Sequence, residues 1–199
     1  MTSQETFVST TVPERVYREK AILGHGGESI VYLVEALEKE NVLPGEFALK
    51  HLNHRALRNM TQGERILKRF ERQVDIMRQL DHPAIVTLVD AGDPAERFVN
   101  PFIVMEYAPG QNLRQALRTC LKENGEEEGM ALPFDEILRI MDPVIDALTY
   151  AHSRPTRIIH RDLKPENIMV GDAVKLLDFG AGKEMVRNGS HETVLTSAG

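Results

Sequence analysis

Cysteine is almost absent from this sequence, because Cys120 is the only one among its 199 residues. No disulfide can form within the chain and no cysteine-based zinc site can be built, which is typical of proteins from a reducing compartment, so we expect a cytoplasmic location. Long apolar runs are also missing: no stretch approaches the roughly 18 residues of a transmembrane helix. The first residues lack the basic start and apolar core of a secretory signal. We therefore expect no membrane segment in this chain.

An excess of positive charge is lacking too. The formal net charge is −6, so the surface as a whole should not attract nucleic acid or an anionic membrane. Basic residues do gather between Arg55 and Arg78, but Glu64, Glu71 and Asp75 alternate with them at helical spacing. This pattern favours a solvated helix face with ion pairs, and we expect no nucleic-acid partner. Hydrophobic residues make up 42% and charged residues 27%, as in ordinary soluble globular proteins.

The first half of the sequence has the pattern of a sheet with one long helix. Short β-branched and apolar stretches, separated by glycine and proline, predict strands, and apolar residues every three or four positions predict a helix. The predicted strands are residues 17–23, 30–37, 46–52, 85–89 and 102–105, and the predicted helix is 63–80.

After Pro109 and Gly110 the pattern becomes helical. Asn112 is a suitable cap for a helix over 113–122, and the acidic residues 123–129 predict a solvated connection. A long apolar-periodic helix follows over 134–152, and Pro143 within it should kink or divide it. The sequence therefore predicts an α+β protein with a β-rich first part and a mostly helical second part.

The strongest chemical signal is the run His-Arg-Asp-Leu-Lys-Pro-Glu-Asn over 160–167, followed by Asp-Phe-Gly over 178–180. These two stretches resemble the catalytic loop and the metal-binding motif of serine/threonine protein kinases of the eukaryotic-like (Hanks) type. The resemblance implies a two-lobe fold, with an antiparallel β-rich N-lobe carrying one long helix and a mostly helical C-lobe.

Residue roles follow from the resemblance. It implies that Asp162 orients the substrate hydroxyl and that Lys164 steadies the γ-phosphate, which also favours serine and threonine over tyrosine as acceptors. Asn167 and Asp178 are implied to hold Mg²⁺ on the phosphates of ATP, because hard oxygen ligands suit that ion. A protein with a serine or threonine acceptor is the implied substrate.

A glycine-rich stretch over 23–31 joins two predicted strands and resembles the kinase glycine-rich loop, although Ser29 stands where the third glycine usually falls. Alone, such a stretch is more often a simple hairpin than a nucleotide site. Lys50, about twenty residues later on a predicted strand, matches the lysine that faces the α- and β-phosphates. The resemblance also assigns nucleotide contacts to Gly24, Gly26, Val31, Ala48, Lys50, Met105, Glu106, Ala108 and Met169, all of which could equally be core or surface residues.

Two features depart from the family. Gln73 stands where kinases carry the glutamate that pairs with the lysine; it shares a helix face with Phe70 and Met77, whereas Glu71 and Asp75 point elsewhere. We expect Gln73 to accept a hydrogen bond from Lys50 that is weaker than a charge-assisted one.

The resemblance also ends within the activation segment. We expect an N-terminal extension over 1–16, an N-lobe over 17–107 and a partial C-lobe over 108–199, with self-association through the incomplete C-lobe. Two hypotheses remain open: an active kinase core, or a pseudokinase-like regulator that binds nucleotide without significant transfer. A small-molecule phosphotransferase with the kinase fold is a weaker third. Thr193, Thr196 and Ser197 are candidate acceptors for an activating phosphate that would pair with Arg161.

Overall fold

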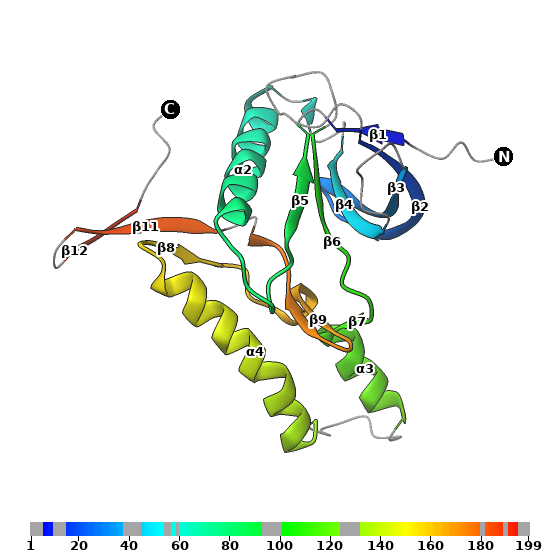
Figure 1. Cartoon of the computed structure of the whole chain (residues 1–199), viewed down its shortest axis with the longest axis vertical. Coiled ribbons are helices and arrows are strands. Elements are labelled where there is room, and N and C mark those ends of the chain that lie inside the picture. Colours follow the sequence, from blue (N-terminus) through cyan, green and yellow to red (C-terminus); the bar gives the residue numbers. More distant parts are fainter. Residues whose placement is uncertain are drawn as a thin grey trace. The chain divides into compact units, whose positions relative to one another are not determined.

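The computed structural model describes residues 6–9, 15–37, 45–53, 57–58, 60–92, 101–123, 132–179, 182–188 and 191–194 (Figure 1). Contacts between residues divide the chain into two compact units. The first unit comprises residues 1–78 and 87–107, and the second comprises 79–86 and 108–199.

The first unit is built on a curled antiparallel sheet with the strand order β1-β2-β3-β4-β6-β5 (Figure 1). Its strands are β1 (Thr6–Val8), β2 (Val16–His25), β3 (Ser29–Leu37), β4 (Glu46–Leu52), β5 (Leu88–Ala91) and β6 (Phe102–Glu106). The predictions of strands at β2, β3, β4 and β6 are confirmed. Glycine and proline breaks between β-branched runs thus located the sheet correctly.

Strand β1 was not predicted, and it completes the core of the sheet. It pairs with β2, so that Phe7 lies opposite Tyr17. The Phe7 side chain is buried and its ring packs 5.5 Å from Tyr32 and 6.0 Å from Phe102, measured between ring centroids. Phe7 therefore belongs to the same apolar cluster as Leu49, although it lies in the stretch that the sequence assigned to an extension.

Helix α2 (Met60–Arg78) confirms the predicted long helix of this unit. Apolar side chains at helical spacing, among them Ile66, Phe70, Val74 and Met77, are buried on one face, and the helix packs near β5. Asp75 lies on the exposed side, where it pairs with Arg78 at 3.6 Å.

The strand predicted over 85–89 was misplaced, because β5 begins only at Leu88. Ile85 instead forms a parallel bridge with Leu176, and the Val86 N–H donates to the Leu176 carbonyl at 3.2 Å. The apolar run at 85–89 therefore divides between two units, a division that periodicity alone does not reveal.

The described part of the second unit holds two helices and two small sheets. Helix α3 (Leu113–Glu123) confirms the predicted helix and its cap: the Asn112 Oδ1 accepts from the Gln115 N–H, and the Gln115 Oε1 accepts from the Asn112 N–H, both at 2.9 Å. This reciprocal capping box satisfies two backbone donors at the start of the helix. The remainder of the acidic connection after α3 lies outside the described residues.

Helix α4 (Phe134–Ser153) runs without interruption through Pro143, so the predicted division of this helix does not occur. One missing backbone donor is tolerated because the helix is fixed by burial of Ile140, Val144, Ala147 and Ala151 along one face. Its other faces leave Phe134, Leu138 and Ile145 exposed. None of the described helices is long and apolar enough to cross a membrane.

The two small sheets of this unit were not predicted in detail. One has the strand order β10-β9-β7 and the other β12-β11-β8. Their strands are β7 (Gln111–Asn112), β8 (Thr156–Ile159), β9 (Ile168–Val170), β10 (Val174–Leu176), β11 (Lys183–Asn188) and β12 (His191–Val194), and a 3₁₀ turn, η1 (Pro165–Asn167), precedes β9. Both units together give the predicted α+β, two-lobe kinase fold.

Candidate active site

The glycine-rich stretch forms the turn between β2 and β3. The turn is closed by a hydrogen bond from the Gly26 N–H to the Ser29 carbonyl at 2.7 Å. Neither Gly24 nor Gly27 has another atom within 4 Å of the position that a Cβ would occupy, and neither has a positive φ. Since neither packing nor backbone conformation requires glycine there, what these residues provide is a bare backbone that a ligand can approach closely.

One face of the sheet carries four of the residues that the resemblance assigned to the nucleotide. Ala48 and Lys50 lie on the same side of β4, opposite to the buried Leu49, because side chains alternate along a strand. Val31 is paired with Lys50, and Met105 is paired with Ala48, so both point to that same side. Strand register therefore brings an ammonium group and three apolar side chains to one surface.

Helix α2 contributes Gln73 to this surface. The Lys50 Nζ donates to the Gln73 Oε1 at 3.1 Å, so the predicted hydrogen bond is confirmed. Gln73 is buried together with Phe70 and Met77, and its Nε2 contacts the Met77 sulfur at 3.9 Å. The group that α2 offers to Lys50 through Gln73 is thus a neutral amide, and a hydrogen bond to it is weaker than one to a carboxylate.

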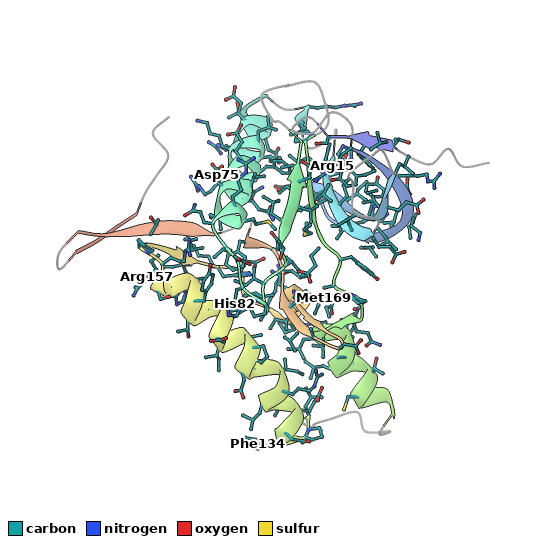
Figure 2. All side chains as sticks on the ribbon, viewed as in Figure 1. Arg15, Asp75, His82, Phe134, Arg157 and Met169 are labelled. Atoms are coloured by element: carbon teal, nitrogen blue, oxygen red, sulfur yellow. The ribbon has the colours of Figure 1, made fainter. Side chains whose placement is uncertain are left out.

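The resemblance implies that Glu106, the last residue of β6, and Ala108 belong to the hinge that binds adenine. The Glu106 N–H donates to the Thr87 carbonyl at 2.9 Å, and its carboxylate accepts from the Thr87 N–H at 3.2 Å. Ala108 begins the next part of the second unit and is half-buried. Met169 lies on β9 (Figure 2). In the strand register it is paired with Lys175 of β10 and with Asn112 of β7.

In the second unit, His160 organises the catalytic loop. Its Nε2 lies 2.8 Å from the Leu177 carbonyl, its Nδ1 lies 3.3 Å from the Asp162 N–H, and its ring packs against Phe179 with 4.5 Å between centroids. Burial lowers the pKa of His160, partly offset by the bond to Leu177. A neutral ring with its proton on Nε2 satisfies both bonds. His160 entered the sequence prediction only as part of the motif. Its role in holding the loop could not be predicted, because Leu177 and Phe179 are distant from it in the sequence.

Asp162 is held in position by two neighbours from its own loop. The Lys164 Nζ donates to its Oδ2 at 2.7 Å, and the Asn167 Nδ2 donates to its backbone carbonyl at 2.8 Å and to its Oδ2 at 3.2 Å. The bond from Lys164 lowers the pKa of Asp162, and the same bond raises the pKa of Lys164. The carboxylate is thus ionised at neutral pH and half-exposed.

Asp178 follows directly after the hydrogen-bonded pair of Leu177 and Asn167, in which the Leu177 N–H donates to the Asn167 carbonyl at 2.8 Å. Asp178 and Arg161 have positive φ values of 51° and 64°, a left-handed conformation that is unusual for residues with a side chain. Such a conformation costs roughly 1–3 kcal/mol and is concentrated at functional sites. Gly180 of the same motif lies outside the described residues.

Helix α3 is tied to the catalytic loop by an ion pair. The Arg114 Nε donates to the Glu166 Oε1 at 2.9 Å, and both side chains are about half-exposed. The Glu166 carboxylate also lies at the N-terminal turn of α3, where negative charge is favourable.

The donor set suits Mg²⁺ bound through phosphates. No cluster of three or more histidine, cysteine or acidic residues that could hold a metal occurs among the residues described here. Asn167 uses its amide nitrogen toward Asp162, so its amide oxygen can face a cation. A carboxylate such as that of Asp178 is also a hard oxygen ligand. One or two protein oxygens together with substrate phosphates are the usual ligands of Mg²⁺.

Comparison with known proteins places this geometry in a family. The model of the protein kinase domain matches residues 17–198. The chain belongs to the protein kinase family. It is 36% identical to the serine/threonine-protein kinase pkn3 of Myxococcus xanthus, over 90% of this chain and 30% of that protein.

Two further relatives are of the same kind. The chain is 32% identical to the serine/threonine-protein kinase PrkC of Bacillus subtilis, over 82% of this chain and 22% of that protein. It is 35% identical to the serine/threonine-protein kinase PknB of Mycobacterium tuberculosis, over 89% of this chain and 26% of that protein. The chain thus spans less than a third of the length of each of these relatives.

Proposed function

We propose that this chain carries the nucleotide-binding and catalytic core of a serine/threonine protein kinase. In this reaction the hydroxyl oxygen of a serine or threonine in a protein substrate attacks the γ-phosphorus of ATP, the bond from that phosphorus to the β–γ bridging oxygen breaks, and ADP leaves. The observation that carries the proposal is the support of Asp162 by Lys164 and Asn167, because it gives an ionised, oriented carboxylate.

Each group has a proposed role. Asp162 orients the attacking hydroxyl and takes its proton, and Lys164, which contacts Asp162, places a positive charge where the transferred phosphoryl group develops negative charge. Lys50 contacts the α- and β-phosphates of ATP. Asn167 and Asp178 would hold Mg²⁺, which neutralises phosphate charge when bound.

The proposal also includes contacts to the adenine base and contacts between the phosphates and the backbone of the glycine-rich turn. Val31, Ala48, Met105 and Met169 would contact the adenine ring, and the backbone of Glu106 and Ala108 would bind its edge. Gly24 and Gly26 would let the phosphates approach the turn, in line with the bare backbone there. We also propose an N-lobe over 17–107 and a C-lobe over 108–199. A cytoplasmic location and self-association are part of the same proposal.

A second function, nucleotide binding without significant transfer, is favoured by one observation. Gln73 stands where kinases carry the glutamate that pairs with this lysine, and its neutral amide accepts a hydrogen bond from Lys50. Such a pseudokinase-like module would bind ATP and a protein partner through the same groups.

The decisive experiment incubates the full-length protein with γ-labelled ATP, Mg²⁺ and a mixture of serine, threonine and tyrosine peptides. We expect label on serine and threonine, and we expect Asp178→Asn to lose it. ATP binding measured by calorimetry without any label transfer would support the second function, and label on tyrosine alone would contradict the assigned acceptor class.

A further inference from the structure

Glu28 occupies a junction of three elements in the first unit. It lies in the turn between β2 and β3, directly after Gly26 and Gly27. Its backbone carbonyl accepts a hydrogen bond at 2.8 Å from the N–H of Asn53, the residue after β4. Its carboxylate forms an ion pair with Arg69 of α2. The turn is thereby fixed to the end of the strand that carries Lys50 and to the helix.

The charge of Glu28 conflicts with a phosphate ligand at this turn. Gly26 and Gly27 are exposed, and no other atom lies within 4 Å of the position that a Cβ of Gly27 would occupy, so a ligand can approach the backbone there. The proposed function places the phosphates of ATP at this turn. A carboxylate in the same turn repels those phosphates unless a cation neutralises it. Arg69 is that cation, and its guanidinium and the Glu28 carboxylate are each about half-exposed.

Arg69 also lies on the helix stripe that holds Lys50. Arg69 and Gln73 are four residues apart on α2, so their side chains leave the helix on the same face, one turn apart. Gln73 binds Lys50 of β4 through a neutral amide, and Arg69 binds Glu28 of the turn through opposite charges. A charge-assisted link between α2 and the turn is therefore found at Arg69, one helical turn away from Gln73.

We propose that Arg69 is a positioning residue for the glycine-rich turn: by neutralising Glu28 and holding it to α2, it permits the polyphosphate of a nucleoside triphosphate to bind at the turn. The inference rests on the nucleotide binding in the proposed function. It predicts that the two single variants differ in ATP affinity. Loss of Arg69 leaves an uncompensated carboxylate at the turn, whereas loss of the Glu28 charge leaves none.

The test measures Mg-ATP and adenosine affinities of the full-length protein by calorimetry. Arg69→Ala should weaken ATP binding about three- to fivefold, which is near the upper end of what one exposed ion pair contributes. Glu28→Gln should bind ATP as tightly as the wild type or more tightly, and the double variant should recover to within about twofold of the wild type. Adenosine, which has no phosphate, should bind all forms equally, and the defect of Arg69→Ala should shrink at high salt.

The ion pair of Arg18 and Glu35 provides the matched control. It joins β2 to β3 in the same unit with similar exposure and includes no residue of the turn. Arg18→Ala should leave ATP affinity unchanged, and thermal unfolding of each variant shows whether it is folded. If Arg69→Ala does not fold, Arg69→Gln with and without Glu28→Gln gives the same comparison.

Three results would overturn the inference: ATP affinity unchanged in Arg69→Ala, Glu28→Gln as damaging as Arg69→Ala, or an equal loss of adenosine affinity. ATP binding without phosphoryl transfer by the wild type would contradict the proposed transfer and leave this inference standing. Absence of ATP binding by the wild type would overturn both.

Discussion

The two units hold their proposed catalytic groups by different means. In the first unit, strand register and apolar packing place Lys50, and its partner Gln73 is a neutral amide within the buried face of α2. In the second unit, Asp162 donates its N–H to His160 and accepts hydrogen bonds from Lys164 and Asn167, and the bond from Lys164 joins opposite charges. A sheet can position a side chain through its regular pairing, whereas an irregular loop must be fixed bond by bond.

The largest expected effect comes from removing the charge at the centre of the polar network. Asp162→Asn should lower the rate of phosphoryl transfer by about 10²–10⁴-fold, the usual contribution of a positioned acid or base. Affinity for Mg-ATP should stay within a few-fold, because the proposed role of Asp162 concerns the hydroxyl and not the nucleotide. Label transfer and calorimetry on the full-length protein measure the two effects.

Asp172→Asn is the control for this change, since Asp172 is exposed in the turn between β9 and β10. Equal transfer by the wild type and Asp162→Asn would remove Asp162 from its role.

A substitution of Phe7 tests how much apolar packing around β1 contributes to the stability of the first unit. Phe7→Ala should destabilise the protein by roughly 3 kcal/mol, because it leaves a cavity among Tyr32, His51 and Phe102. Chemical denaturation measures the loss. Phe134→Ala removes an equally large side chain that is 74% exposed, and it should change stability little. Similar losses in the two variants would show that β1 does not close the core.

The strands of the first unit show which parts of the fold could be predicted from the sequence. Residues 46–52 were predicted with the bounds that the structure gives, because a strand paired on both sides carries a dense apolar pattern. β1 was missed because only Phe7 and Val8 are apolar within a polar stretch, and the burial of Phe7 depends on residues distant in the sequence. Local pattern identifies central strands well and edge strands poorly.

The candidate site shows the same division. The resemblance identified Gln73 as the residue facing Lys50, and helical spacing placed it on the face of Phe70 and Met77. Other contacts join residues of separate elements. They are the hydrogen bond of His160 with Leu177 and the ion pairs Arg114–Glu166 and Arg69–Glu28. No local pattern predicts such pairs, since they depend on how the elements pack.

The polar network should also respond to pH through His160. Burial lowers the pKa of His160 in the folded state below its value of about 6.5 in the unfolded chain. The unfolded chain therefore takes up more protons as pH falls, so the stability contributed by neutral His160 is complete above about pH 6.5 and is lost on acidification. His160→Phe should be less stable by roughly 1–3 kcal/mol at pH 7.5, because the Leu177 carbonyl loses its donor.

The same variant should show a smaller decrease in melting temperature between pH 7.5 and 5.5, because it lacks the titrating group. His152→Phe changes an exposed histidine at the end of α4 and should retain the pH dependence of the wild type. An identical pH dependence in His160→Phe and the wild type would contradict the assignment of a neutral His160.

The smallest expected effect comes from replacing the neutral amide that contacts Lys50 by a carboxylate. Gln73→Glu gives Lys50 a carboxylate in a partly buried position, where a charge-assisted hydrogen bond is roughly twice as strong as a neutral one. If the orientation of Lys50 limits the reaction, the transfer rate should rise by about two- to fivefold, as expected for at most ~1 kcal/mol. Gln62→Glu adds the same charge to an exposed position on α2 and should leave the rate unchanged. A rate that falls in Gln73→Glu would mean that the carboxylate competes with the nucleotide phosphates for Lys50. In that case the neutral amide is the better partner in this protein, and the contrast between the two units is part of how it binds its nucleotide.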